Sequence, residues 1–430
     1  MFEVNDIDKK EKVKYIKYYI KKHVYLIERH NRRKGGKLMR KLSLIGRIAI
    51  CLILGIIIGL SCKSIFLDFP IRILVTISGL FGNFLSFIIP LIIIAFIVPG
   101  IASLGKKSGK GLLITTILAY ISTITAGTLT YIVSLIALPN FLKGNINLSE
   151  SAQGVSAYFA IEMPAIMNVM SALILAFILG IGLSRIEDSK LLVVFNEFSD
   201  IVLKVIKGVL IPFVPIYIGC IFANLAYNGE IVETLKSFAV VYIVLFSMQA
   251  IYILIQYVIA GTIKKENPFK LLKNMIPAYL TAVGTQSSAA TIPVTLKSVE
   301  NNKVSSEVKD FVVPLCATIH LAGDTITLVV TSMAVMYMNG QEPTFSKIMP
   351  FILMLGVTMI AAPGIPGGGV MAALGLLETM FGFGTVEKPI MIALHAAQDS
   401  FGTATNITGD GAIAIIVDYI LNRKDKNKAE

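Results

Sequence analysis

The sequence predicts an all-α polytopic membrane protein, on the strength of its composition, its long apolar runs and two broken segments near its C-terminal end. Hydrophobic residues make up 55% of the 430 residues, charged residues only 15%, and the mean hydropathy is +0.75. Such a chain has too few charges to coat a water-soluble surface. A hydrocarbon core needs roughly 20 mostly apolar residues per spanning helix, and several runs reach that length.

Six apolar runs before residue 265 are predicted to span the membrane. Their approximate bounds are 42–62, 71–104, 111–138, 158–184, 191–227 and 232–263. Basic residues gather in the short segments between them, so the net charge of +12 indicates positive-inside topology rather than nucleic-acid binding. With a cytoplasmic N-terminus every basic loop lies inside, and the basic tail at 423–430 places the C-terminus there too.

Residues 1–41 form a basic head with two possible structures. Apolar residues recur there at helical spacing beside lysines, which favours an amphipathic helix on the inner leaflet. A disordered basic tail is the alternative. The four cysteines lie in or beside apolar runs and have no metal-ligand spacing, so we expect them to pack as small apolar side chains.

Two apolar segments in the C-terminal part are broken by residues that do not suit lipid. Segment 267–298 contains Gly-Thr-Gln-Ser-Ser-Ala-Ala-Thr-Ile-Pro, and segment 347–383 contains Ala-Pro-Gly-Ile-Pro-Gly-Gly-Gly. Lysines flank the first segment on both sides, which predicts a re-entrant hairpin from the cytoplasm. The second has no basic flank and is expected to enter from outside. Full helices at 304–337 and 388–421 follow, giving eight transmembrane helices plus two re-entrant hairpins as an inverted repeat.

The two full C-terminal helices share a local pattern. One reads Ala-Thr-Ile-His-Leu-Ala-Gly-Asp at 317–324, and the other reads Ala-Thr-Asn-Ile-Thr-Gly-Asp at 404–410. Aligned on Gly-Asp, His320 pairs with Asn406 and Asp324 with Asp410. Broken segments at matching positions of two repeats point to a binding site between them.

Three aspartates inside apolar runs are candidate site residues: Asp324, Asp399 and Asp410. A carboxylate near the bilayer centre costs at least about 2.5 kcal/mol, so an ion, a substrate group or a protein partner should satisfy each. An internal hydrogen-bond network without a ligand is the alternative. His320 and Asp324 are four residues apart, which would place them on one helical face as a titrating pair. The alternative is a neutral imidazole in a structural hydrogen bond.

The hairpin tips carry groups suited to a small ligand. Ser287, Ser288 and Thr291 offer hydroxyls beside helix-start amides, which suit a carboxylate. Gly364 and the glycines at 367–369 let the second tip bend and bring its backbone close to a ligand, although tight turns would use them equally. The sequence has no phosphate-binding loop, zinc-binding histidine pair or nucleophile elbow, so neither an enzyme nor a cofactor is predicted.

These residues resemble the dicarboxylate/amino acid:cation symporter family, which has the glutamate-transporter fold. The matching motifs are Ser287-Ser288 with Thr291-Ile292-Pro293, Ala317-Thr318-Ile319, Gly364-Ile365-Pro366-Gly367, and Asp399 with Asn406-x-Thr408-Gly409-Asp410. The resemblance follows the span order over nearly the whole chain. It implies a plasma-membrane homotrimer that works as an elevator-type transporter, with a six-span scaffold region at 42–265 and a transport core at 266–422.

The resemblance also implies roles for single residues. Asp399 would bind the amino group of an amino acid, while Asn406, Thr403 and the tip at Ser287, Ser288 and Gly364 would surround its α-carboxylate. Sodium, the coupling ion, would be held by Asp410, Asn406 and the segment at Thr318 and His320, with Ser122 and Thr123 contributing from the third helix. Asp324 would face the substrate side chain.

Departures from the family pattern bear on the substrate. The family's motif Asn-Met-Asp-Gly-Thr reads His320-Leu321-Ala322-Gly323-Asp324 here. Ala322 thus replaces the aspartate that completes one sodium site, as also occurs in serine/threonine-type members. That sodium site should therefore be lost or weakened. Gly402 and Gln286 occupy the positions of the arginine that grips an acidic side chain. The expected function is therefore sodium-coupled uptake of a neutral or polar amino acid, and a cationic amino acid remains open. Protons are an alternative or additional coupling ion. The alternatives are a dicarboxylate or acidic amino acid symporter, and an uncoupled channel or membrane sensor on the same fold.

Overall fold

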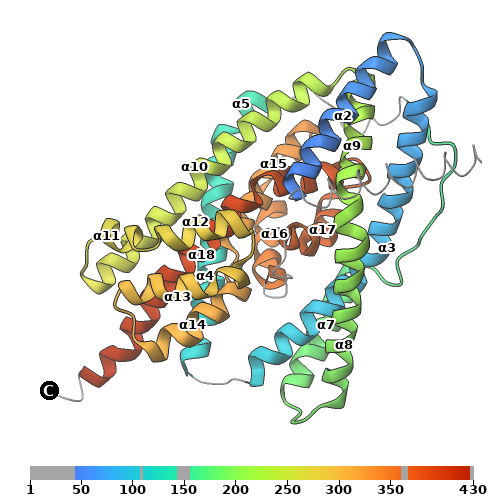
Figure 1. Cartoon of the computed structure of the whole chain (residues 1–430). Coiled ribbons are helices and arrows are strands. Elements are labelled where there is room, and N and C mark those ends of the chain that lie inside the picture. The colour runs from blue at the N-terminus through green and yellow to red at the C-terminus, as the bar shows by residue number, and fades with distance from the viewer. Residues whose placement is uncertain (1–43, 107–109, 143–154, 360–366, 427–430) are drawn as a thin grey trace, which may run out of the picture.

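The computed structural model describes residues 44–106, 110–142, 155–359 and 367–426, and within these ranges it contains helices and no strands (Figure 1). The predicted basic head, the tip residue Gly364 and the end of the basic tail lie outside the described residues. Seven helical stretches in the described ranges are long and apolar enough to cross a membrane. The chain is therefore a multi-pass membrane protein, as its composition predicts.

The helices before residue 265 follow five of the six predicted spans closely. They are α2 (Leu44–Ser64), α3 (Phe69–Lys106), α4 (Lys110–Ala137), the short α5 (Pro139–Leu142), α7 (Val169–Ser184), α8 (Lys190–Val205), η1 (Ile206–Leu210), α9 (Ile211–Asn228) and α10 (Ile231–Lys264). The stretch from α8 through the π-helical turn η1 to α9 is continuous and forms the fifth span.

The fourth predicted span, at 158–184, is wrong in its first part. Residues 155–168 contain no helix, and α7 begins only at Val169, after Pro164 and the N-cap residue Asn168. The Asn168 side chain accepts a hydrogen bond from the Ser171 amide at 2.7 Å, which satisfies one of the free donors of the first turn. With 16 residues, α7 is about 24 Å long, shorter than a hydrocarbon core of about 30 Å.

The C-terminal part follows the predicted order of broken segment, helix, broken segment, helix. The first broken segment contains α11 (Pro268–Lys273), α12 (Ile276–Thr285) and α13 (Ser288–Asn301). The second contains α16 (Phe345–Thr358) and α17 (Gly368–Phe381), and the last helix is α18 (Glu387–Lys426). The chain reverses between α12 and α13 at Gln286, whose φ of 53° lies in the left-handed region.

The helix expected at 304–337 is not continuous. It divides into α14 (Ser306–Ile319) and α15 (Ala322–Met338), because His320 and Leu321 have non-helical backbone angles (φ −108°, ψ 92° and φ −116°, ψ 50°). The break falls on the segment that the sequence had singled out. It leaves the first amides of α15 free to take partners from elsewhere in the protein.

The helix α18 runs through the middle of the molecule and packs against α10, α12, α14 and α15 (Figure 1). Helices α11 to α14 lie at one end, and α2, α3 and α9 lie at the other. One buried hydrophobic cluster joins α3 and α7 to α10 with α15 to α18, and a second joins α11 to α14 with the end of α18.

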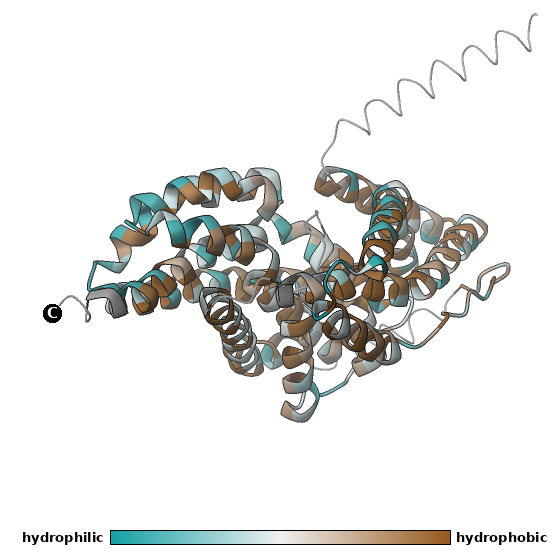
Figure 2. Ribbon diagram, turned by 90° about the horizontal axis from the view of Figure 1, so that it is seen from below, coloured by the Kyte–Doolittle hydropathy of each residue, from teal (hydrophilic) through white to brown (hydrophobic). Residues whose placement is uncertain are grey.

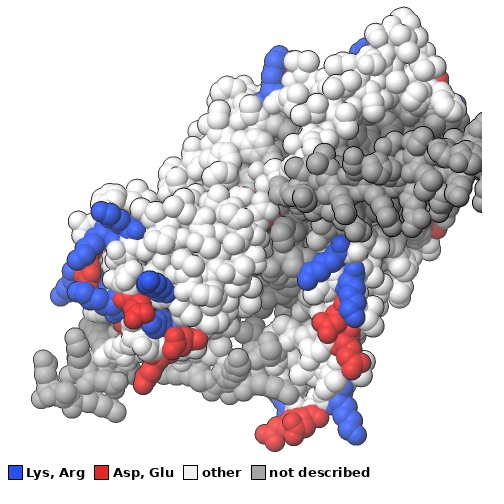
Figure 3. All heavy atoms as spheres, in the orientation of Figure 1, with Lys and Arg blue, Asp and Glu red and all other residues white. Residues whose placement is uncertain are grey.

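Many large hydrophobic side chains are exposed on the outer helices, as contact with a bilayer requires. Figure 2 shows hydrophobic residues along most of the ribbon and more hydrophilic ones near α11 to α14. In Figure 3 the charged side chains gather over α11 to α14 and around α7 and α8, and the face between them carries almost none. This arrangement fits a protein with a wide lipid-facing band.

Candidate functional site

One face of α18 carries most of the candidate site. His395, Asp399, Thr403, Asn406 and Asp410 follow one another at spacings of four, four, three and four residues, which aligns them on one side of a helix. All five are buried, with exposed fractions between 0% and 6%. A polar stripe of this kind on a buried helix must be satisfied by partners, and the partners form two clusters.

The first, called here the Asp399 cluster, consists of Asp324, His395, Asp399 and Asn406. The Asp324 carboxylate accepts from His395 Nε2 on Oδ1 and from Asn406 Nδ2 on Oδ2, both at 2.7 Å. One ligand atom of Asp324, one of His395 and one of Asp399 all lie within 4.8 Å of one another. The cluster therefore concentrates two carboxylates in a small buried volume, which favours a cation beside them.

Helix starts help to hold these carboxylates. The Gly367 amide, at the N-cap of α17, donates to Asp399 Oδ2 at 2.9 Å. Asp324 lies in the first turn of α15, and the Asn406 Oδ1 atom accepts from the free Gly323 amide of the same turn at 2.7 Å. The positive end of a helix dipole stabilises an acidic group, so the helix start after the break at His320 and the start of α17 at Gly367 both stabilise the cluster.

The first hairpin tip reaches α18 beside Asp399. Gln286 Nε2 donates to the Ser400 hydroxyl at 2.9 Å. Ser287 is the N-cap of α13 and accepts from the Ala290 amide at 3.3 Å, and Ser288 is buried. The structure thus brings the tip close to the Asp399 cluster, as the sequence predicts, while the proposed carboxylate contacts of Ser287, Ser288 and Thr403 stay predictions.

The second, called here the Asp410 cluster, consists of Ser122, Tyr252, Gln256, His320 and Asp410. The His320 imidazole joins two helices, because Nδ1 contacts Asp410 Oδ1 and Nε2 contacts the Ser122 hydroxyl, both at 2.9 Å. The Gln256 amide donates to the same hydroxyl at 3.0 Å, and the Tyr252 hydroxyl donates to the Ser122 carbonyl at 2.6 Å. Helices α4, α10 and α18 are therefore linked through the break between α14 and α15.

The residues expected to bind sodium fall into two groups. In the part of the chain that the structure describes, Asp410 has a vacant carboxylate oxygen, whereas the hydroxyls of Ser122, Thr123 and Thr318 are already bonded or exposed. Among the described residues, Asp410 Oδ2 is buried and has no hydrogen-bond partner, and an orphaned carboxylate oxygen of this kind suits a cation. On the α4 side the His320 ring stands between Ser122 and Asp410. The Thr123 hydroxyl is bonded to the carbonyl of Ala119 on its own helix, and Thr318 is exposed. The donor set therefore fits one ion at Asp410 better than a second at Ser122.

The expected pairing of His320 with Asp324 is wrong. The helix is broken between them, so a spacing of four residues does not put them on one face. His320 belongs to the Asp410 cluster and Asp324 to the Asp399 cluster. Each is already held by hydrogen bonds to other side chains.

His395 is one of three residues of the two clusters that the sequence did not predict. It is completely buried and contacts Asp324 directly. Its position four residues before Asp399 was a usable signal, because both then lie on the same face of α18. Tyr252 and Gln256, four residues apart on α10, were missed for a different reason, since only the fold shows that α10 faces Ser122.

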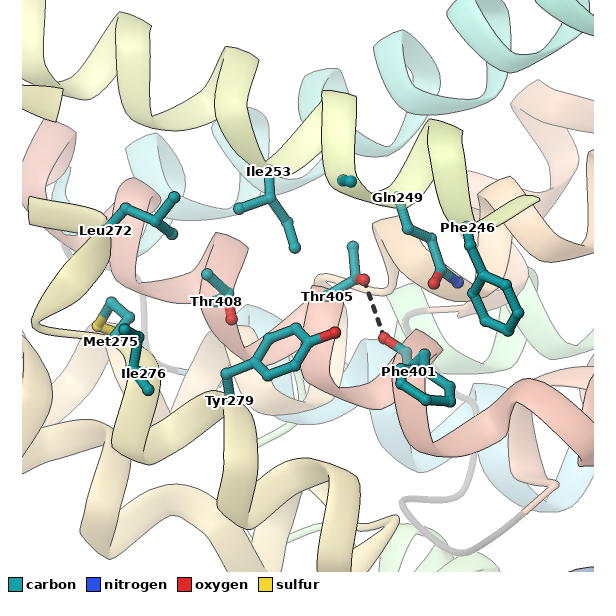
Figure 4. A pocket seen from close by; sticks show the side chains of 11 residues that line it. Phe246, Gln249, Ile253, Leu272, Met275, Ile276, Tyr279, Phe401, Thr405 and Thr408 are labelled. Carbon is teal, nitrogen blue, oxygen red and sulfur yellow. Dashed lines mark hydrogen bonds between the residues drawn. The ribbon is translucent and has the colours of Figure 1, made fainter. Parts of the chain in front are cut away.

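A cavity of about 510 Å³ lies on the opposite face of α18 (Figure 4). It is bounded by α10, α11, α12 and α18, and Phe246, Ile253, Met275 and Phe401 give it a mostly apolar lining. The hydroxyls of Thr405 and Thr408 are bonded to carbonyls of their own helix at 2.9 and 2.7 Å. The polar clusters lie on the other side of α18, so this cavity is not the candidate site.

Basic side chains do not neutralise the Asp399 cluster. In the part of the chain that the structure describes, no lysine or arginine forms an ion pair with Asp324 or Asp399. The buried Lys388 pairs with Glu378 at 2.8 Å instead. Gly402, at the place expected for an arginine, lies where α15 and α18 cross, since a Cβ added to Gly323 would lie 2.3 Å from the Gly402 carbonyl oxygen.

Comparison with known proteins gives a consistent result. The chain matches the model of the Sodium:dicarboxylate symporter family over residues 44–420. It is 28% identical over 279 residues to the human neutral amino acid transporter A, a match covering 61% of this chain and 50% of that protein. It is 27% identical over 262 residues to an excitatory amino acid transporter of Caenorhabditis elegans, a match covering 60% of this chain and 52% of that protein. It is 29% identical over 271 residues to the mouse excitatory amino acid transporter 2, a match covering 60% of this chain and 46% of that protein. The chain spans about half the length of the curated relatives it matches.

Proposed function

Because the chain belongs to the sodium:dicarboxylate symporter family, we propose that it is a cation-coupled symporter that takes up a neutral or polar amino acid. Amino acid transporters among its relatives support the solute class. The observation that carries the proposal is the Asp399 cluster, where two carboxylates and two helix starts meet in a buried volume. A zwitterion needs a negative group for its ammonium and helix-start amides or hydroxyls for its carboxylate.

Asp399 is the proposed partner of the substrate ammonium. It accepts one hydrogen bond from the described residues, from the Gly367 amide, whereas both oxygens of Asp324 are taken by side chains. The hydroxyls of Ser287 and Ser288 at the first hairpin tip, with Thr403, are the proposed partners of the α-carboxylate. The contact between Gln286 and Ser400 keeps that tip near Asp399.

The electrostatics of the cluster support a substrate without an acidic side chain. A second carboxylate would need a cation to offset its burial, and Gly402 and Gln286 supply none. An acidic side chain would also meet Asp324. Uptake of glutamate or succinate without uptake of neutral amino acids would favour the dicarboxylate alternative.

Sodium is the proposed coupling ion at Asp410, where the unpartnered Oδ2 atom supports a bound cation. Coupling to protons is the alternative, and separate sodium and pH gradients distinguish the two ions. We further propose a plasma-membrane location with both termini in the cytoplasm, and a homotrimer that moves the region after residue 266 as an elevator.

The proposal is tested by uptake of labelled amino acids into liposomes, with sodium and pH gradients imposed separately. Wild-type protein should accumulate a neutral amino acid when sodium is higher outside. Asp399→Asn removes the charge that holds the ammonium and should weaken substrate binding at least about 30-fold, because breaking a buried charge pair costs about 2–5 kcal/mol. Asp410→Asn should abolish the sodium dependence.

The control is Asp200→Asn, on the exposed surface of α8, which should leave uptake unchanged. Unchanged affinity in Asp399→Asn would remove that residue from the amino-group role. Transport that needs no sodium would contradict the assignment of Asp410, and ion flux without any accumulated amino acid would favour a channel.

A further inference from the structure

We propose that His395 influences which side-chain charges this site accepts, because its hydrogen bond to the Asp324 carboxylate competes with a cationic substrate group. The inference rests on the proposed function, because it concerns which amino acids bind at Asp399. His395 is a positioning residue in this scheme. It acts on the substrate through Asp324.

Each oxygen of Asp324 already accepts a hydrogen bond from a buried side chain, with which a ligand cation would have to compete. Oδ2 accepts from the Asn406 amide and Oδ1 accepts from His395 Nε2. Since an ionised carboxylate can only accept, the His395 Nε2 atom carries the hydrogen in this contact. Among the described residues His395 Nδ1 has no hydrogen-bond partner. Within that part of the chain, the ring of His395 is therefore held by its one hydrogen bond to Asp324.

Helix α17 packs against this pair. A Cβ atom added to Gly369, in the first turn of α17, would lie 2.6 Å from Asp324 Oδ1 and 3.3 Å from His395 Nε2. The α17 backbone therefore lies directly beside the hydrogen bond, and a larger residue at 369 would have to move Asp324 or His395.

Loss of His395 would change the charge pattern of the site. Asp324 Oδ1 would then be a buried oxygen without the His395 hydrogen bond, and a carboxylate oxygen of Asp324 lies within 4.8 Å of one of Asp399. Two available carboxylates this close together suit two positive groups on a short scaffold. A 2,4-diamino acid carries such groups, whereas a neutral amino acid carries only its α-ammonium. In this scheme His395 lowers the affinity for basic amino acids at a site whose two carboxylates would otherwise favour them.

The test measures binding to purified protein in detergent at pH 7, by thermal stabilisation with L-alanine, L-serine, L-homoserine, L-2,4-diaminobutyrate and L-lysine. The quantity compared is the affinity for 2,4-diaminobutyrate relative to the best neutral amino acid. His395→Leu should raise this ratio at least about tenfold. His395→Gln, whose amide can still donate to Asp324, should keep the wild-type ratio.

Two more variants separate positioning from general damage. His395→Leu combined with Asp324→Asn should lose the gain, because the second carboxylate is no longer present. His395→Asn, whose shorter amide cannot reach Asp324, repeats the test if the leucine variant does not fold. An unchanged ratio in the leucine and asparagine variants, or a gain that persists without Asp324, overturns this inference alone. A wild-type protein stabilised by none of these amino acids overturns the proposed function and this inference with it.

Discussion

The three buried aspartates differ in how many of their oxygens are already bonded. Asp324 has both oxygens held by side chains, Asp399 accepts from one backbone amide, and Asp410 has one oxygen on His320 and one without a partner among the described residues. A carboxylate with a vacant acceptor in a buried site is the better ligand for a cation. The bonding pattern therefore supports the proposed ligand roles of Asp399 and Asp410, and it ties Asp324 to neighbouring side chains.

Replacing His320 by alanine should destabilise the protein, because Asp410 would lose the hydrogen bond to its buried carboxylate. We expect the free energy of unfolding to fall by about 2–4 kcal/mol, measured by denaturation in sodium-free detergent solution. Adding Asp410→Asn to this variant should recover part of the loss, since a buried neutral amide costs less than a buried charge.

Thr318→Ala is the matched control for that experiment. Its hydroxyl is exposed and bonds the Leu315 carbonyl on its own helix at 2.8 Å, so the change should stay within about 0.5 kcal/mol. Equal effects of the histidine and threonine variants would show that the bridge to Asp410 contributes nothing to stability.

Single residues could be predicted from the sequence where the cost of burial marks them. Asp324, Asp399 and Asp410 stand out because a carboxylate inside an apolar run needs a partner. His395 does not stand out in this way, since a histidine can be buried neutral at lower cost. The partner of each aspartate could not be predicted either, because it depends on how α15, α17 and α18 meet in space.

At the scale of the helices, most boundaries could be predicted because length and hydropathy are local properties of the chain. The break at His320 and Leu321 could not, since neither residue is a helix breaker. Contacts from other helices stabilise it: the Asn406 side chain caps the Gly323 amide, and the His320 ring binds Asp410 and Ser122. A local pattern cannot report contacts with residues 90 and 198 positions away.

The pair of α2 and α9 depends on small residues at its crossing. Gly55 and Gly59 on α2 face Gly219 and Ala223 on α9, and a Cβ on Gly55 would lie 2.1 Å from the Gly219 carbonyl oxygen. Both helices therefore repeat a small residue every four positions, which lets backbones approach closely in a membrane. Because the obstacle is backbone, a larger side chain there must push the helices apart.

Gly219→Leu should accordingly lower the free energy of unfolding by about 1–3 kcal/mol, the usual cost of overpacking, measured by thermal unfolding in detergent. Gly182→Ala is the control, because an added Cβ at this glycine of α7 meets no atom within 4 Å. A leucine at 219 that costs no more than the alanine at 182 would contradict the close crossing.

At the scale of the whole molecule, α18 connects two turns that are bonded to its opposite ends, so its length gives their separation. The Asn339 side chain, after α15, donates to Glu387 at the start of α18 at 3.1 Å. Ser305, before α14, donates to Asp418 near the other end of α18 at 2.6 Å. The 31 helical steps from residue 387 to residue 418 extend about 46 Å, more than the hydrocarbon core of about 30 Å. We therefore expect the two turns to lie on opposite sides of the membrane.

Basic residues identify which side each turn faces. Lys264 at the end of α10 donates to the carbonyls of Asn302 and Lys303, so the end of α10 and the turn before α14 lie together. Lys265, Lys270 and Lys273 follow directly in sequence. By the positive-inside rule we expect this group of lysines to face the cytoplasm and the turn after α15 to face the outside.

This orientation is tested by labelling single cysteines in intact cells and in inverted vesicles with a membrane-impermeant maleimide. Lys303→Cys should react only from the cytoplasmic side, and Glu342→Cys, exposed in the turn between α15 and α16, only from the outside. The parent protein is the control, since its native cysteines are buried or half-buried in apolar helices. Labelling of both positions from one side would mean that α14 and α15 do not cross the membrane, and the two hairpins would then enter from the same face.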